Sequence, residues 1–478
     1  MNQEFDPGVP LCVDLDGTLI HTDMLHESVM VLLADNPLNV LRLPFWLLAG
    51  KAALKRKIAS RVQMDPRSLP YNEPLIAWLR SERSAGRRLV LATASDERFA
   101  HSINEHLGLF DEVVASDGSI NMAGRHKAAA LEQRFGKGRF DYAGNATPDL
   151  TVWGSARRGV VVSASARVSK AAQQATTVER EFAAVKPNFH DWRRMLRVHQ
   201  WLKNGLLFVP MLAAHQLSFA LFAQVLLGVI AFSLCASSVY ISNDLLDLES
   251  DRQHPRKRLR PFAAARIPIW VGCAATPLLL AASVAVGTLV GSHFLLWLGV
   301  YFAVTLAYSL GLKKLVLVDG FTLAALYTLR IVAGAAAVRH EVSFWLLAFS
   351  VFLFLSLAFV KRYAELDLMK ERGREKAHGR GYEVADAPLV QTLGLASGYA
   401  AVVVLALYLN SDAMRALYQA PEWMWGAVPA VMFWISWVWL KTHRGEMHDD
   451  PVVFAIKDRT SLCVGGIFIA SLVLGVVA

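Results

Sequence analysis

The feature that most constrains the fold is a series of long apolar stretches that occupies the chain from about residue 200 onward. About 20 consecutive apolar residues are enough to cross a bilayer as a helix. Nine stretches are candidates, at residues 203–217, 219–243, 268–288, 293–311, 316–337, 343–361, 388–410, 424–440 and 461–478. We therefore predict that this part of the chain is an all-α polytopic membrane domain of nine transmembrane helices.

The first 190 residues or so contain no such stretch and have the mixed composition of a soluble domain. A chain of 478 residues is also too long for one ordinary domain. We therefore predict an N-terminal domain at residues 1–165, a linker at 166–190 and the membrane domain at 191–478.

The net charge is +9, although only 19% of the residues are charged. In a membrane protein, an excess of Lys and Arg is typical of cytoplasmic loops and of contact with anionic lipid or substrate. The charge therefore requires no nucleic-acid partner, and we predict none. The four cysteines form no CxxC pair, which argues against a zinc site or a disulfide framework.

The loops predict the side of the membrane on which the N-terminal domain lies. The first ten residues lack a basic segment followed by an apolar one, so we expect no cleaved signal peptide. With a cytoplasmic N-terminus, the loops after even-numbered spans hold 19 Lys and Arg, against two in the other loops. This is the positive-inside pattern. We predict an integral protein of a bacterial-type inner membrane whose N-terminal domain and active sites face the cytoplasm.

Three aspartates mark the end of the second span. Asp244, Asp247 and Asp251 have i, i+3, i+7 spacing, which predicts three carboxylates on one helical face. Such carboxylates repel one another and need a cation, and Mg²⁺ prefers oxygen ligands and commonly bridges to substrate phosphates. The loop continues as HPRKRLRP over residues 254–261, whose cations could hold phosphate oxygens. The alternative is a charged loop that only sets membrane topology.

Longer motifs in this half of the chain resemble a known family. NDxxDxxxDxxHPxKxxRP at residues 243–261 resembles the first aspartate-rich motif of the UbiA superfamily of intramembrane prenyltransferases, and residues 308–313 resemble its YSxxLK segment. The resemblance covers about residues 190–478. It implies nine helices around a central cavity and a catalytic Mg²⁺ site, formed by the three aspartates, under the cytoplasmic loops.

The second acidic motif departs from that of the aromatic prenyltransferases. Where those carry two or more aspartates after helix six, this chain reads KRYAEL at residues 361–366. Lys361 and Glu365 lie at i, i+4 and could form a helical ion pair. Together with QWxKN at residues 200–204, the segment resembles the polyprenyl-phosphate phosphoribosyltransferase branch of the superfamily. That resemblance implies phosphoribosyl pyrophosphate as donor and a polyprenyl phosphate as acceptor.

Two phosphate-bearing substrates need more fixed cations than an aromatic acceptor does. Arg330, inside the fifth span, either faces the cavity or pairs with a carbonyl where helices pack, and we favour the cavity. The residues expected to bind substrate are Lys203, Asn243, His254, Lys257, Arg258, Arg260, Lys313, Arg330, Lys361, Arg362 and Glu365.

The N-terminal domain alternates strands and helices, which predicts a parallel sheet with its site at the carboxyl ends of the strands. An apolar strand ends in Asp14 and Asp16, and Gly17 permits a sharp turn after them. The polar residues that follow later strands and helices are Thr93, Lys127, Asn145 and Asp149.

In this order, these residues resemble the haloacid dehalogenase superfamily of phosphohydrolases over about residues 8–165. The resemblance implies a Rossmann-like α/β domain with a helical cap at about residues 22–84. It also implies that Asp14 is the nucleophile, which forms an aspartyl-phosphate, and that Asp16 is the general acid and base.

The same resemblance implies that Thr93 and Lys127 hold the phosphoryl group and that Asp149 is catalytic. Mg²⁺ would join Asp14, the Asp16 carbonyl and the GNxxxD segment that begins at Gly144. Asn145 stands where the family typically has an aspartate. Its amide oxygen can bind Mg²⁺ but brings no negative charge, which puts the metal affinity in doubt.

We expect a bifunctional enzyme with one Mg²⁺ in each active site. The membrane domain would transfer 5-phosphoribose to a polyprenyl phosphate, and the N-terminal domain would remove the 5-phosphate from the product. One alternative is an ordinary prenyltransferase with an isoprenyl diphosphate donor, and another is a degenerate or regulatory N-terminal scaffold. The KRYAEL segment favours the first function, and Asn145 keeps the scaffold open.

Overall fold

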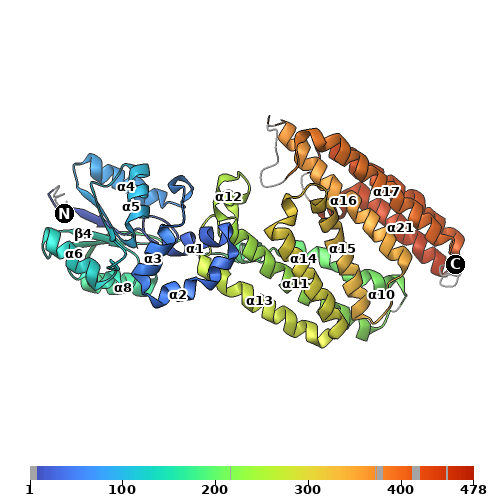
Figure 1. The fold of residues 1–478 in the computed structure, drawn as a ribbon, viewed down its shortest axis with the longest axis horizontal. Coiled ribbons are helices and arrows are strands. Elements are labelled where there is room, and N and C mark those ends of the chain that lie inside the picture. Colours follow the sequence, from blue (N-terminus) through green and yellow to red (C-terminus); the bar gives the residue numbers. More distant parts are fainter. Residues whose placement is uncertain are drawn as a thin grey trace. The chain divides into compact units, whose positions relative to one another are not determined.

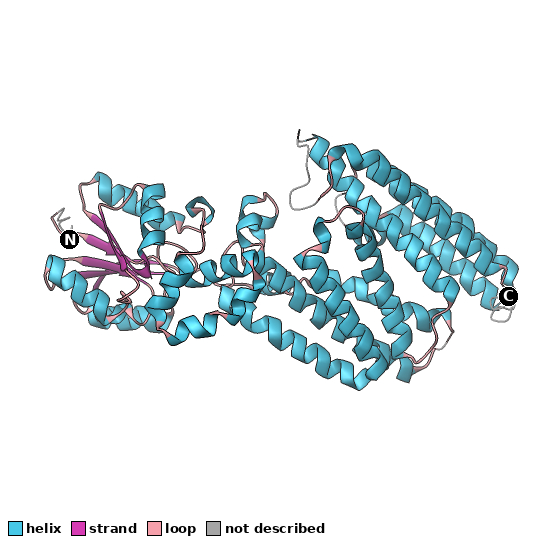
Figure 2. Ribbon diagram, viewed as in Figure 1, coloured by secondary structure: helices cyan, strands magenta, loops and turns pink. Residues whose placement is uncertain are grey.

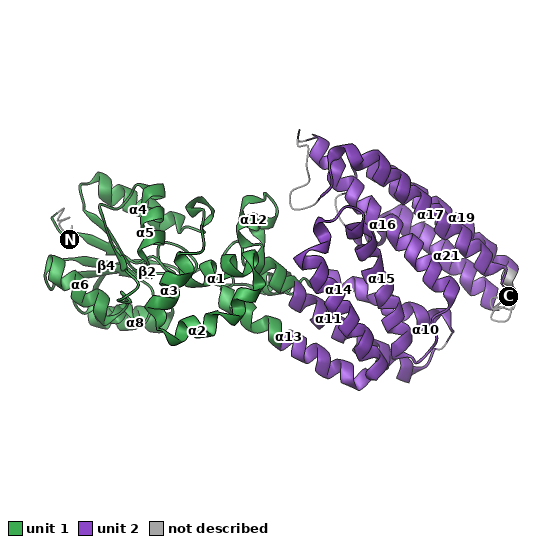
Figure 3. Cartoon of the chain, in the orientation of Figure 1, with its two compact units in different colours: residues 1–197, 240–277 green, residues 198–239, 278–478 purple. Residues whose placement is uncertain are grey.

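The structure, a computed structural model, describes residues 8–215, 217–371, 373, 381–411, 420–447 and 450–477. The chain forms two compact units, which Figure 3 distinguishes by colour. The first comprises residues 1–197 and 240–277, and the second comprises residues 198–239 and 278–478. The aspartate-rich segment therefore belongs to the same unit as the N-terminal domain.

A six-stranded sheet forms the core of the first unit (Figure 2). Its order is β3-β2-β1-β4-β5-β6, and every neighbouring pair is parallel. In the central strand, Leu11 lies opposite Leu89 on one side and Asp141 on the other. The strands are β1 (Leu11–Val13), β2 (Leu89–Asp96), β3 (Glu112–Ser116), β4 (Asp141–Gly144), β5 (Arg158–Val162) and β6 (Thr177–Phe182).

Helices cover both faces of this sheet, which explains why its central strands are continuous apolar runs. Leu11 and Val13 of β1 pack into one core with α4 and α5, and Cys12 packs into the opposite core with α6, α7 and α8. The predicted α/β domain with a parallel sheet is confirmed. The helices are α4 (Glu73–Ser84), α5 (Glu97–Leu107), α6 (Arg125–Phe135), α7 (Asp149–Trp153) and α8 (Ala166–Ala175).

The sheet extends beyond the predicted end of the domain. A linker was expected at residues 166–190, but α8 and β6 lie within that range, and β6 pairs in parallel with β5. Strand β6 is an edge strand with exposed or half-buried side chains, so its polar sequence gave no sign of a strand. Only residues 183–188 remain as an irregular connection before α9 (Phe189–Met195).

The helical cap is shorter than the predicted range of 22–84. Helix α4 packs against the sheet through Leu75, Ile76 and Leu79, so it belongs to the core layer. The cap has a small core of its own around Leu54 and Ile58. Its elements are α1 (Met24–Asp35), η1 (Pro37–Leu41), α2 (Leu43–Leu48), α3 (Lys51–Ala59) and η2 (Pro66–Ser68) (Figure 1).

Within the described residues, eight helices are long and apolar enough to cross a membrane, so the prediction of nine is not confirmed. The predicted first span, 203–217, forms the 3₁₀ segment η3 (Val198–Phe208) and the short α10 (Val209–Ala213), with Pro210 near the start of α10. The eight spans centre on α11 (Phe219–Leu246), α13 (Ile269–Val290), α14 (Ser292–Leu310), α15 (Val318–Ala337), α16 (Phe344–Glu371), α17 (Ala387–Leu409), α19 (Ala427–His443) and α21 (Arg459–Val477).

Two of these spans differ from their predicted form in ways that matter for the site. Helix α16 continues ten residues past its predicted end at residue 361, so KRYAEL is helical. Helix α15 is the most buried of the eight spans, since 67% of its 18-residue apolar stretch is buried inside the structure. Polar side chains on α15 therefore lie in the interior of the second unit.

Candidate active sites

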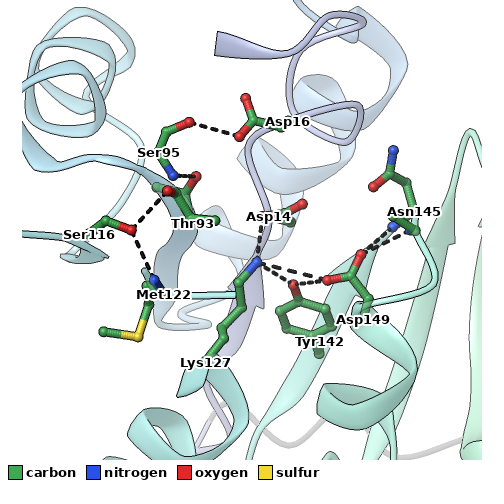
Figure 4. Close-up of polar contacts among 12 residues, drawn as sticks. Asp14, Asp16, Thr93, Ser95, Ser116, Met122, Lys127, Tyr142, Asn145 and Asp149 are labelled. Atoms are coloured by element: carbon green, nitrogen blue, oxygen red, sulfur yellow. Dashed lines mark hydrogen bonds and ion pairs between the residues drawn. The ribbon is translucent and has the colours of Figure 1, made fainter. Parts of the chain in front are cut away.

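The first candidate site lies at the carboxyl ends of the parallel strands, as Figure 4 shows. Asp14 follows β1, Thr93 lies in β2 and Asn145 follows β4. The Asp14 N–H donates to the carbonyl of Ala143 at 2.9 Å, which holds the two central strands together at this edge. Because parallel strands end at one edge, residues far apart in sequence converge there.

Lys127 of α6 joins the two ends of this cluster. Its Nζ donates to Asp14 Oδ1 at 2.6 Å and to the Tyr142 hydroxyl at 2.9 Å, and that hydroxyl donates to Asp149 Oδ1 at 2.7 Å. Burial raises the pKa of Asp14 to about 7, and Lys127 opposes that rise only in part. A further cation at Asp14 would therefore favour its ionised, nucleophilic form.

Asp16 is held by groups that differ from those around Asp14. Its Oδ1 accepts from the N–H of Met24 at 2.7 Å, at the start of α1, and its Oδ2 accepts from the Ser95 hydroxyl at 2.8 Å. Burial raises the pKa of Asp16 to about 6, and the charge of Asp23 adds to the rise. A carboxyl group with such a pKa can give and take a proton near neutral pH.

The loop that carries Asn145 is fixed by Asp149. Asp149 Oδ2 accepts from the N–H groups of Asn145 and Ala146, both at 3.0 Å. The Asn145 amide lies against Gly17, where an added Cβ would come within 2.0 Å of Nδ2, and Gly17 has φ +71°. A larger residue here would be strained at this φ and would require the Asn145 amide to move. The Asp14 carboxylate, the Asp16 carbonyl and the Asn145 amide supply the oxygen donors that Mg²⁺ prefers, with one negative charge fewer than an aspartate would give.

Three residues described at this site were missed from the sequence: Tyr142, Ser95 and Lys55. Lys55 comes from the cap helix α3, and its Nζ donates to the carbonyl of Ala94 at 2.6 Å and to Asn121 Oδ1 at 3.2 Å. Both acceptors are neutral, and burial lowers the Lys55 pKa. Nothing in the local sequence distinguishes Lys55 from its neighbours on α3, because its role depends on how the cap closes over the strand ends.

The aspartate-rich segment forms a second cluster in the first unit. Asp244 and Asp251 are almost fully buried and share one guanidinium, since Arg260 Nη1 donates to Asp244 Oδ1 at 2.9 Å and to Asp251 Oδ2 at 2.6 Å. Arg197 donates to Asp244 as well. Burial raises the pKa of Asp251, and Arg260 opposes the rise. Arginine thus supplies the compensating charge in this structure.

The three aspartates do not lie on one uninterrupted helix, although Asp244 and Asp251 converge on Arg260. Helix α11 ends at Leu246 and the short α12 (Leu248–Gln253) follows Asp247, which has φ −96° and ψ 12°, although the N–H groups of Asp247 and Asp251 still donate to the carbonyls four residues earlier. Across the described residues, no three Asp, Glu, His or Cys side chains group as metal ligands. The segment can still bind a cation, because the carboxylate oxygen Asp251 Oδ1 is buried and accepts no hydrogen bond.

The residues of the basic loop after α12 differ in their contacts and in their exposure. Lys257 Nζ lies 3.8 Å from Asp251 Oδ1, whereas Arg258 is exposed. His254 Nδ1 accepts from the N–H groups of Arg256 and Lys257 at 3.2 and 3.3 Å, so this side chain fixes the turn. Asn243 is half-buried on α11, and its carbonyl accepts from the N–H of Asp247.

Another polar cluster lies inside the second unit. Lys203 Nζ donates to Asp450 Oδ2 at 2.6 Å, Lys361 Nζ lies 3.8 Å from the same oxygen, and the Tyr327 hydroxyl donates to Asp450 Oδ1 at 3.1 Å. Asp450 also caps α20 (Pro451–Lys457). Two predicted substrate-binding lysines therefore meet at one carboxylate.

The YSxxLK and KRYAEL segments meet in a further network. Arg362 contacts Asp319, and its Nη1 donates to Glu365 Oε2 at 2.5 Å, while the Tyr308 hydroxyl donates to Asp319 Oδ1 at 2.8 Å. Lys361 was a possible partner of Glu365 at i, i+4, but Glu365 pairs with Arg362 at i, i+3, and Lys361 Nζ lies near Asp450. Lys313 lies half-buried in η5 (Leu312–Lys314), just after the YS pair.

Arg330 lies in the core of the second unit. Its three nitrogens donate to Asn204 Oδ1 at 2.9 Å, to the carbonyl of Leu326 at 2.6 Å and to the Tyr301 hydroxyl at 3.0 Å. The guanidinium also lies over the Tyr301 ring at 4.9 Å. The guanidinium thus contacts an amide, a phenol and a carbonyl of its own helix, and substrate binding by Arg330 stays a prediction.

Comparison with known proteins identifies the family to which the membrane half belongs. Residues 205–472, more than half of the chain, match the UbiA prenyltransferase family. The chain belongs to this family. It is therefore a membrane transferase, and the resemblance seen in the aspartate-rich motif is confirmed.

Three similar proteins cover different parts of this UbiA-family chain. An uncharacterized protein, y4nM, of Sinorhizobium fredii is 39% identical over 98% of this chain and 92% of its own length. The decaprenyl-phosphate phosphoribosyltransferase of Mycolicibacterium smegmatis is 33% identical over 56% of this chain and 86% of its own length. A phosphoserine phosphatase structure aligns at 13% identity over 37% of this chain and 94% of that chain, with a TM-score of 0.27.

Proposed function

We propose that the membrane half transfers 5-phosphoribose from phosphoribosyl pyrophosphate to a polyprenyl phosphate. The observation that carries this proposal is a group of cations from the QWxKN and KRYAEL segments, held in place by carboxylates. Lys203 and Lys361 pair with Asp450, and Arg362 pairs with Asp319. Fixed cations suit substrates that both bear phosphates. The 33% identity to a decaprenyl-phosphate phosphoribosyltransferase supports the same choice.

The chemistry needs no strong general base. An oxygen of the lipid phosphate attacks the anomeric carbon, the bond from that carbon to the pyrophosphate oxygen breaks, and pyrophosphate leaves. Mg²⁺ would neutralise charge on the leaving group. We assign Asp244 and Asp251 to hold it, because both are buried and Asp251 keeps an oxygen without a donor. Arg260, which bridges the two aspartates, would then turn to the pyrophosphate.

The test of this proposal uses purified protein, Mg²⁺, labelled phosphoribosyl pyrophosphate and a polyprenyl phosphate. We expect a labelled lipid with wild type and none with Asp244→Ala or Asp251→Ala, although both variants stay folded in detergent. Full activity in either variant, or after chelation of the metal, would contradict the assignment of the aspartates. Turnover of an isoprenyl diphosphate with an aromatic acid, and none of phosphoribosyl pyrophosphate, would favour the ordinary prenyltransferase.

We propose further that the N-terminal domain removes the 5-phosphate from the lipid-linked product. Asp14 would attack the phosphorus and Asp16 would protonate the departing ribose oxygen. Water, deprotonated by Asp16, would then release phosphate from the aspartyl-phosphate. The buried Lys127 beside Asp14 and the pKa of about 6 at Asp16 support these roles. Both active sites would face the cytoplasm.

The comparison of wild type with Asp14→Asn tests this second activity. The variant removes the nucleophile but leaves the aspartate-rich segment intact, so it should transfer phosphoribose and accumulate the 5-phosphorylated lipid. Wild type should yield the dephosphorylated lipid and free phosphate. If both chains make the same phosphorylated lipid, the domain is not its phosphatase, and the scaffold alternative is favoured.

A further inference from the structure

The cap of the N-terminal domain exposes a group of large apolar side chains, here called the α2 patch. It lies on η1 and α2, and its members are between 51% and 86% exposed. Six such side chains within eleven residues exceed the scattered apolar residues that are normal on a surface, and such patches mark interaction sites. The patch consists of Leu38, Val40, Leu41, Phe45, Leu47 and Leu48.

The other side of this segment explains why it is ordered. Leu43 and Trp46 pack against the small core of the cap around Leu54 and Ile58. The side chain of Asn36 caps η1 by accepting from the N–H of Leu38. Inward residues thus anchor the segment, and the patch is the outward face of a folded element with no described partner in this chain.

The charges around the patch indicate its partner. Residues 36–64 contain six Lys and Arg and no Asp or Glu, and two of the six, Lys55 and Arg56, contact residues of the sheet domain instead of facing the patch. Arg42 and Lys51 are exposed on either side of α2, and the exposed Arg61 lies over the Trp46 ring at 4.8 Å. A helix with an apolar outer face, an aromatic residue and flanking cations is typical of segments that lie in the interface of an anionic bilayer.

An ion pair ties the cap to residues at the membrane boundary. Glu27 of α1 accepts two hydrogen bonds from Arg252, at 2.6 and 3.0 Å, and both side chains are buried. Arg252 Nε also donates to the carbonyl of Ala263 at 3.0 Å. Arg252 follows the membrane-spanning helix α11 by six residues. The cap, and with it the patch, is therefore held close to where the chain enters the membrane.

We propose that the α2 patch docks on the anionic lipid surface of the membrane in which this protein resides, with its leucines and Phe45 among the headgroups. Contact with lipid would bring the phosphatase-like site to a substrate that cannot leave the bilayer. Only this last consequence rests on the proposed function. The docking itself goes beyond it and is tested without any substrate.

The experiment measures the surroundings of a fluorescent label on the patch. The exposed Cys273 and Cys463 are replaced by serine, Leu48→Cys is labelled with NBD, and the full chain is placed in phosphatidylethanolamine–phosphatidylglycerol vesicles. We expect strong quenching by doxyl-labelled lipid and weak quenching by iodide. The control Glu105→Cys, on an exposed position of α5, should show the reverse.

Three outcomes decide the proposal. Quenching of the Leu48 label by lipid, and weaker lipid quenching in vesicles of neutral phosphatidylcholine, supports it. Quenching by iodide alone would place the patch in water and overturn it. Protection from both quenchers would mean that a protein surface or a second copy of the chain covers the patch, and would overturn it as well.

An activity measurement separates this proposal from the proposed function. Leu48→Asp should lower hydrolysis of the lipid-linked phosphate at least several-fold and leave hydrolysis of p-nitrophenyl phosphate unchanged, because the small ester needs no membrane contact. Equal loss of both activities would argue against docking. If wild type hydrolyses neither compound, the proposed phosphatase function fails, and the quenching result still decides the docking.

Discussion

At the residue scale, we expect Asn145 to set how firmly the N-terminal site binds Mg²⁺. Its backbone N–H is held by Asp149 and its amide lies against Gly17, and we propose that the amide oxygen binds Mg²⁺. Of the expected Mg²⁺ ligands, Asp14 brings a carboxylate charge, and an aspartate at position 145 would bring a second. Affinity for a hard divalent cation depends on the number of charged ligands.

We predict that Asn145→Asp strengthens Mg²⁺ binding at the N-terminal site. The added charge should lower the Mg²⁺ concentration needed for half-maximal hydrolysis of p-nitrophenyl phosphate by about tenfold. The measurement is a Mg²⁺ titration of wild type and variant at fixed pH, with Asp14→Asn as the inactive control. An unchanged midpoint would mean that residue 145 does not ligate the metal.

Lys55 supports a second prediction at this scale. Among the described residues, its ammonium group donates to two neutral acceptors, and although Asp14 and Asp16 lie close enough to act on its charge, it can pair with an anionic substrate. Lys55→Met should raise the KM for a phosphomonoester by about tenfold, the worth of a charged hydrogen bond, with a smaller change in kcat. Lys51→Met, on an exposed position of the same helix, is the control and should have no effect. Equal KM values for the two variants would contradict the prediction.

At the element scale, the chain changes from helix α11 to the short helix α12 at Asp247, whereas the spacing of the aspartates alone predicts one continuous helix. Asp247 stands at this junction, while Asp244 and Asp251 still meet at Arg260. Arg252, beyond the junction, pairs with Glu27 of the cap helix α1. The N-terminus of the same helix donates to Asp16. Helix α1 therefore contacts the proposed general acid at its start and the aspartate-rich segment one turn later.

We predict that Glu27→Gln loosens both α1 and α12. Removal of one partner from a buried ion pair leaves an uncompensated charge and typically costs about 3–5 kcal/mol. Hydrogen exchange should become faster for amides of α1 and α12 and remain unchanged in α5. Glu105→Gln, which alters an exposed carboxylate on α5, is the matched control. Exchange rates like those of wild type in both helices would show that the pair contributes little.

At the scale of the whole molecule, sequence patterns predicted the parts but not how they meet. Apolar length predicted eight helices that the structure contains, and apolar strands ending in Asp14, Thr93 and Asn145 predicted the edge of the sheet. Strand β6 was not predicted, because an edge strand buries little apolar surface and its sequence is therefore polar. Lys203 and Asp450 pair across 247 residues, and no local pattern carries such a contact.

The fusion of two catalytic domains leads to a last prediction, which rests on the proposed function. A second site on the same chain sees its substrate at a raised effective concentration, provided that the connection permits contact. Vesicles with wild type should therefore accumulate less 5-phosphorylated lipid than vesicles with an equimolar mixture of Asp14→Asn and Asp244→Asn chains. The measurement is the time course of the phosphorylated and dephosphorylated lipids, with Asp14→Asn alone as the control that forms only the first. The difference should shrink as protein density rises, because separate chains then meet more often by lateral diffusion. Identical time courses at low density would show that the product diffuses freely between chains before it is hydrolysed.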